Sequence, residues 1–244
     1  MKKYILLFTT FAFVACVTDN DDFEADASET QLLKSVSLNN VLLYSFDYNS
    51  EKQIKAIVTL SGGGISGFTS YEYSNDTVYK TTNGVFSSKF KSFKTSSNTI
   101  KLMEYNNDNN LIFFYLSTYS SSNCQLVKSE NYTQYNQLYT TTEYDYIDNN
   151  CSYNSKLMLF NGVQKNKYSI VKDDKNNYLT SLNEWPSFEK KHNIIEYRKW
   201  DTNDNLILSA SYNSFYVYDN NNYPIQETRT SLSGVTKVYT YEYY

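Results

Sequence analysis

The chain has 244 residues, of which 22 are basic and 26 acidic, giving a formal net charge of −4. No basic patch stands out, so the chain lacks the phosphate-neutralising surface of a nucleic-acid-binding protein and we expect no nucleic-acid partner. A metal site built from several histidines is excluded because His192 is the only histidine. Its neighbours Lys191 and Asn193 indicate a solvated loop position.

Residues 1–15 predict a cleaved export signal. Two lysines precede an apolar run over 4–14 that is too short to cross a bilayer, and the run ends in Ala15 and Cys16. The segment Phe13-Val14-Ala15-Cys16 resembles the lipobox of a bacterial lipoprotein. That resemblance implies cleavage before Cys16 and lipid on its sulfur and new amino terminus, so the membrane becomes a partner through the lipid. The alternatives are an ordinary signal peptide or a buried N-terminal strand.

Residues 16–37 predict a disordered acidic tether, because they are charged and show no hydrophobic periodicity. The acids are Asp19, Asp21, Asp22, Glu24, Asp26 and Glu29. Their position next to the lipidated cysteine resembles the surface-export signal of Bacteroidota lipoproteins. The resemblance implies an outer-membrane lipoprotein that faces the periplasm or the cell surface, with the surface favoured.

Residues 38–244 predict a single β domain, because apolar and polar residues alternate with a period of two. Tyr239, Tyr241 and Tyr243 share one face near the C-terminus, and the run from Leu206 to Tyr212 alternates in the same way. The 26 tyrosines suit a half-wet pleated surface, since the ring is apolar and the tip polar. We predict an all-β antiparallel up-and-down meander, closed or strongly curled into a barrel that protects its edges.

Asn- and Asp-rich clusters predict hairpin loops of four or five residues between the strands, because these side chains bond their own backbone and tolerate left-handed conformations. Each has an aromatic or long residue, Asn or Asp, three polar residues, then Asn or Gln. Clear cases start at positions 48, 105, 172 and 200, and variants start at 73 and 218. The uneven spacing argues against a solenoid of fixed period.

One cluster carries a family resemblance. Tyr218-Asp219, followed by Tyr223-Pro224 and a returning Tyr239-Thr240-Tyr241, resembles the tyrosine–aspartate repeats of bacterial surface and toxin-encapsulating proteins. Asn222 stands where those repeats usually have glycine, and it can adopt the same backbone. The layout over roughly residues 40–244 resembles uncharacterised Bacteroidota lipoproteins with a porin-like β-meander. These resemblances imply a fold and no catalytic residue.

Two cysteines remain once Cys16 is assigned to lipid. Cys124 and Cys151 form an even pair in an oxidising compartment, which favours a disulfide. Closing a loop of that length would stabilise the fold by about 3–4 kcal/mol. The alternative is two unpaired thiols.

No motif predicts an enzyme, a metal site or a cofactor. The run Gly62-Gly63-Gly64 lacks the lysine and helix of a phosphate loop. The segment 201–205 imitates the start of a calcium loop, but Leu206 replaces the turn glycine and Tyr212 the bidentate acid, so an Asx-rich turn is expected. A pair of carboxylates that cleaves glycosides stays open, because its spacing is a tertiary property.

Trp185 and Trp200 flank the least regular segment of the chain, and Tyr197 lies near Trp200. Together they could form a stacking platform for a sugar or a peptide, although the favoured alternative is that both indoles fill the core or a barrel end. We therefore hypothesise a non-catalytic envelope protein that binds a glycan or an envelope protein through an aromatic face. The alternatives are a structural or accessory subunit of an envelope complex and, less favoured, a glycoside hydrolase.

Overall fold

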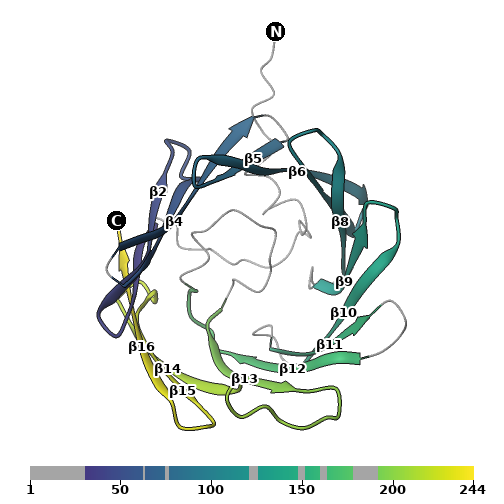
Figure 1. Cartoon of the computed structure of the whole chain (residues 1–244). Helices are drawn as coiled ribbons and strands as arrows, with labels where there is room; N and C mark the ends of the chain where they lie inside the picture. Colours follow the sequence, from purple (N-terminus) through teal and green to yellow (C-terminus); the bar gives the residue numbers. More distant parts are fainter. Residues whose placement is uncertain are drawn as a thin grey trace, which may run out of the picture.

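A computed structural model describes residues 31–62, 64–74, 77–120, 126–147, 152–159, 164–177 and 192–244. The described chain is all-β and forms one closed antiparallel barrel of 16 strands (Figure 1). The strands are β1 (Leu33–Leu38), β2 (Val41–Tyr48), β3 (Ile54–Ser61), β4 (Gly64–Ser74), β5 (Thr77–Thr82), β6 (Val85–Ser96), β7 (Thr99–Tyr105), β8 (Leu111–Tyr119), β9 (Leu126–Thr133), β10 (Leu138–Tyr146), β11 (Tyr153–Leu159), β12 (Gln164–Lys172), β13 (Ile194–Trp200), β14 (Tyr212–Tyr218), β15 (Pro224–Ser231) and β16 (Thr236–Tyr243). None of the described residues forms a helix long and apolar enough to cross a membrane.

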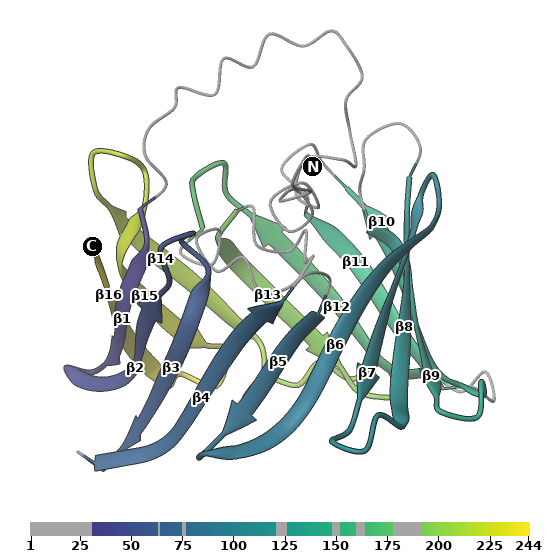
Figure 2. The same cartoon turned by 90° about the horizontal axis from the view of Figure 1, so that it is seen from above.

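The closing pair confirms the predicted closed meander. Every strand pairs with its neighbours in sequence, and β1 pairs with β16 in a register that sets Val36 opposite Tyr241. The start of β1 and the end of β16 lie at the same end of the barrel, the upper end in Figure 2. β1 begins at Leu33, ahead of the domain boundary expected at residue 38.

The Asn- and Asp-initiated hairpin loops are confirmed in four places. The carboxamide oxygen of Asn49 accepts hydrogen bonds from the backbone N–H groups of Glu51 (3.0 Å) and Gln53 (2.9 Å). Asn106, Asp201 and Asp219 accept the same two bonds in their own turns. The fourth residue of each turn has a positive φ, and these residues are Lys52, Asn109, Asp204 and Asn222. Asn222 therefore replaces glycine as expected.

The strand expected from Leu206 to Tyr212 is wrong. Leu206 makes only an isolated bridge to Trp200, and β14 begins at Tyr212. The N–H groups of Ala210 and Ser211 both donate to the carbonyl oxygen of Ile207, which coils the chain into a turn. These local hydrogen bonds replace the ladder, so alternation alone does not produce a strand here.

The handedness of L-residues determines which side chains face the lumen. Viewed from outside, β1 lies to the left of the rising strand β2 and β3 lies to its right (Figure 2). In a rising strand, residues that face this viewer direct their own N–H to the right. The N–H of Asn49 donates toward the β3 side, to Gln53, so Asn49 faces outward. By alternation Tyr44, Phe46 and Tyr48 face inward.

Burial agrees with this assignment. Extended through the registers, the inward face includes Val36, Phe90, Tyr153, Ile170 and Tyr241, and all of these are buried. The small apolar core cluster also lies on this side, across β16, β1, β2 and the start of β3. The barrel is therefore lined by aromatic side chains.

Candidate functional site

A belt of stacked side chains crosses five adjacent strands on the lumen face. We call this set the tyrosine belt: Tyr168 (β12), Tyr197 (β13), Tyr212 (β14), Arg229 (β15) and Tyr239 (β16). The rings of Tyr197 and Tyr212 stack with centroids 5.1 Å apart and planes within 15°. The ring centroids of Tyr168 and Tyr197 are 5.9 Å apart. The guanidinium of Arg229 lies between the rings of Tyr212 (4.4 Å) and Tyr239 (4.8 Å).

A buried carboxylate fixes the orientation of Arg229. Glu227 is fully buried, and Arg229 donates to it from Nε (2.7 Å) and from Nη2 (3.1 Å). Ser214 and Tyr241 donate to the same carboxylate at 2.6 and 2.7 Å. Burial lowers the pKa of Arg229, but the hydrogen bonds and charge of Glu227 outweigh it and raise that pKa overall. The guanidinium is therefore a permanently charged, pre-oriented donor.

A cavity of about 290 Å³ opens beside this pair. Its wall consists of Val36, Tyr44, Phe46, Ile57, Arg229, Tyr239 and Tyr241, which come from β1, β2, β3, β15 and β16. The volume is at the lower end of that of small-molecule pockets, and such pockets typically combine an apolar lining with a few fixed polar groups. Tyr44 keeps 40% of its surface exposed, so the cavity communicates with solvent.

Catalysis by Glu227 has little chemical support. A general acid or base needs a carboxylate that can exchange a proton with its substrate. The two carboxylate oxygens of Glu227 already accept four hydrogen bonds, from Ser214, Tyr241 and two nitrogens of Arg229. The side chain is also fully buried. No cluster of potential metal ligands occurs among the described residues.

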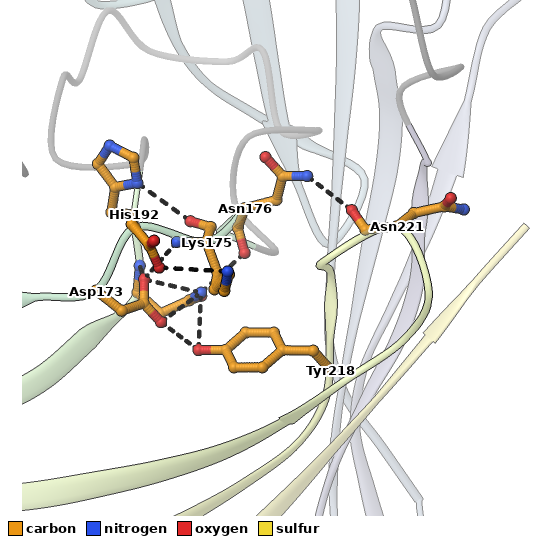
Figure 3. A network of polar contacts seen from close by, with 8 residues as sticks. Asp173, Lys175, Asn176, His192, Tyr218 and Asn221 are labelled. Atoms are coloured by element: carbon orange, nitrogen blue, oxygen red, sulfur yellow. Dashed lines mark hydrogen bonds and ion pairs between the residues drawn. The ribbon is translucent and has the colours of Figure 1, made fainter. Parts of the chain in front are cut away.

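A second polar network joins residues at the ends of β12 and β14 (Figure 3). The phenol of Tyr218 donates to the Asp173 carboxylate, and the buried amide of Asn193 donates to Asp173 and to the carbonyl oxygen of Asn176 (2.8 Å). Asn176 in turn donates from its side chain to the carbonyl oxygen of Asn221. Burial and the bond to Asp173 raise the pKa of Tyr218. The network therefore fixes both ends of the β12–β13 connection to the barrel wall.

The hairpin loop expected at 172–178 is wrong in its length, because the turn contains an insertion. Asp173 accepts from the N–H of Lys175 (3.1 Å), as the other turn residues do. The closing N–H comes from Asn193 (3.0 Å), 20 residues further on, and Asp173 N–H donates to the carbonyl oxygen of Asn193. In the Asn49 turn the same closure spans four residues. The hydrogen bonds of the turn are thus kept. The extra residues come between Lys175, whose N–H donates to Asp173, and Asn193, whose N–H closes the turn.

The residues expected to form a binding platform do not share a face. Tyr197 lies in the tyrosine belt, whereas Trp200, three residues later on β13, lies on the outer face with Lys167 5.3 Å from its ring centroid. Trp185 lies outside the described residues. Their part in ligand binding stays a prediction.

Cys16, Cys124 and Cys151 also lie outside the described residues, so lipidation and the disulfide stay predictions. Titration of thiols in the denatured chain tests the disulfide.

The sequence patterns did not predict a role for Arg229 and Glu227. Their signal was opposite charges two positions apart, on the same face of a strand that pairs with two tyrosine-rich strands.

The fold defines a class, a closed antiparallel β-barrel of the porin-like kind. The chain is similar to the crystal structure of a porin-like protein from Bacteroides uniformis, with a TM-score of 0.55 and 11% identity over 89% of this chain and 94% of that one. A porin-like protein from Bacteroides vulgatus has a TM-score of 0.47 and 10% identity over 88% of this chain and 99% of that one. No family model and no curated protein matches the chain. At such identities the likeness shows the fold alone.

Proposed function

We propose that this protein is a lipid-anchored envelope barrel that binds a ligand in its lumen through an aromatic wall, without catalysis. The observation that carries the proposal is the arrangement of the two faces. The stacked tyrosines and the cavity lie inside, where they can contact a ligand, and the outer wall is rich in charge. Aromatic rings with polar tips suit a glycan or a peptide segment.

The outer wall supports anchoring through Cys16 over insertion of the barrel into a bilayer. Barrels that span a membrane present an apolar band to lipid. The outward positions here carry many charges, among them Asp47, Glu72, Lys91, Lys128, Glu130, Glu143, Glu196 and Arg198. Lys128 and Glu130 pair at 2.8 Å on this wall. A lipid at the N-terminus, with display at the cell surface favoured, fits a barrel whose wall stays in water.

The experiment is a glycan-array and calorimetric screen of the purified full chain, followed by aromatic replacements. Tyr239→Ala, which removes a ring beside the cavity, is expected to weaken any ligand found by at least about tenfold, since one stacked ring contributes about 1–3 kcal/mol. Phe215→Ala is the matched control, because Phe215 lies on the outer wall and is 71% exposed. If Phe215→Ala abolished binding of a ligand and Tyr239→Ala left it intact, binding in the lumen would be refuted.

A second candidate function, an accessory subunit of an envelope complex, has its own observation. Several hairpins at the end opposite the termini carry exposed apolar tips, including Ile65 (73%), Val85 (70%) and Val235 (58%). Exposed apolar groups concentrated on one end favour a contact with a partner. A photo-crosslinking residue at position 85, but not at the outer-wall position 55, would then give one discrete adduct in cells.

A further inference from the structure

The charges of the lumen differ from those of the whole chain. Although the chain carries a net charge of −4, the charged side chains that face inward from the described strands are mainly basic. They are Lys80, Lys94, Lys172, Lys199, Arg229 and Lys237, against Glu104 and Glu227. A concave site lined by one sign of charge concentrates ligands of the opposite sign.

Two of these cations are direct cross-strand partners, and one of them, Arg229, lines the cavity. Arg229 on β15 pairs in register with Lys237 on β16, and like charges placed directly opposite are destabilising. Glu227 is bonded to Arg229 and compensates one positive charge. Lys237 is exposed and forms no ion pair with any residue that the structure describes. One uncompensated positive charge therefore remains at this position.

One donor nitrogen of Arg229 also has no acceptor among the described residues. Its Nε and Nη2 atoms are bonded to Glu227, whereas Nη1 donates to no acceptor in the described part of the chain. The side chain keeps 29% of its surface exposed and contributes to the cavity wall. The stacked rings of Tyr212 and Tyr239 prevent the guanidinium from turning toward another partner. The free Nη1 of a fixed guanidinium and an ammonium at the paired position of the next strand together suit a carboxylate.

Resting on the proposed function, we infer that the lumen site binds a ring compound that carries a carboxylate. The ring lies against the apolar wall of Val36, Phe46 and Ile57, and the carboxylate accepts hydrogen bonds from Arg229 Nη1 and the ammonium of Lys237. The anion also relieves the repulsion between the two cations. An acidic sugar and an aromatic acid share this chemistry, and the test separates them.

The test is calorimetry on the full chain with two pairs of probes. Digalacturonate is compared with its neutral methyl ester, and 4-hydroxybenzoate with 4-hydroxybenzamide. We expect at least one acid to bind about tenfold or more tightly than its neutral partner, because charge-assisted bonds are about twice as strong as neutral ones. The acid that binds identifies the source of the ring. Its affinity is expected to fall as salt concentration rises.

Lys237→Gln is the decisive variant, since an exposed lysine is removable without loss of the fold. It is expected to weaken the acid about tenfold and to leave the neutral probe unchanged. Lys55→Gln is the matched control, because Lys55 pairs with Asp47 on the outer wall. Neutral probes that bind as well as the acids would overturn the inference and leave lumen binding standing. Failure of every probe at millimolar concentration, or an acid whose affinity is indifferent to Lys237→Gln, would also overturn it.

Discussion

Removing either member of the Glu227–Arg229 pair is expected to destabilise the barrel unequally. Arg229→Gln leaves a fully buried carboxylate with two neutral donors, Ser214 and Tyr241, and no counter-charge. Breaking a buried pair in this way costs about 3–5 kcal/mol. Glu227→Gln leaves the cation with 29% of its side chain exposed, so water compensates part of the loss. We expect a cost of about 1–2 kcal/mol in that case.

The double variant Glu227→Gln, Arg229→Gln removes both charges and leaves neither one buried without a partner. Its free energy of unfolding is therefore expected to fall by less than the two single losses together, with a coupling of at least about 1 kcal/mol. Urea unfolding of the full chain, followed by tyrosine fluorescence and circular dichroism, measures all three values. A larger loss for Glu227→Gln than for Arg229→Gln, or losses that simply add, would refute the reasoning.

Three further predictions concern the polar network, the insertion and the anchor. The raised pKa of Tyr218 means that the unfolded chain releases this phenolic proton first, so the contribution of this phenol to stability is constant below about pH 10 and falls above it. Tyr218→Phe should flatten that alkaline loss in unfolding titrations. Deleting residues 177–192 places Asn193 four positions after Asp173 and should change barrel stability by less than about 1 kcal/mol; a collapse of folding would show that the insertion is part of the core. Cys16→Ser should abolish palmitate labelling and release the protein from membranes, whereas persistence of both would disprove lipidation.

Sequence patterns predicted the local structure where one short-range rule decides the outcome. Alternation placed Tyr239, Tyr241 and Tyr243 on one face, and their register with β1 confirms it. The Asp219 turn was predicted because an Asx side chain satisfies its own backbone, with Asn222 at positive φ. Both features depend on interactions within a few residues.

Alternation could not predict which face is the lumen, because it is symmetrical between the two sides. The direction depends on strand order around the closed barrel, which the β1–β16 pairing sets across the whole chain. The Leu206–Tyr212 run failed for another reason. The carbonyl oxygen of Ile207 accepts two local hydrogen bonds in place of bonds to a neighbouring strand. Such a turn leaves no mark on the alternation of apolar and polar residues, so the sequence pattern could not predict it.

The insertion after Asp173 shows how one turn of the barrel is lengthened without altering the strands that it joins. Asp173 and Asn193 close the turn with the same hydrogen bonds that Asn49 and Gln53 make, so strands β12 and β13 meet in an unaltered way. Extra chain then costs the barrel little, because loop-closure entropy rises slowly with length. The ends of the insertion lie within the ring of strands (Figure 1), and their contact residue Tyr218 belongs to the inward face. The described ends of the insertion, residues 173–177 and 192–193, therefore lie on the lumen side.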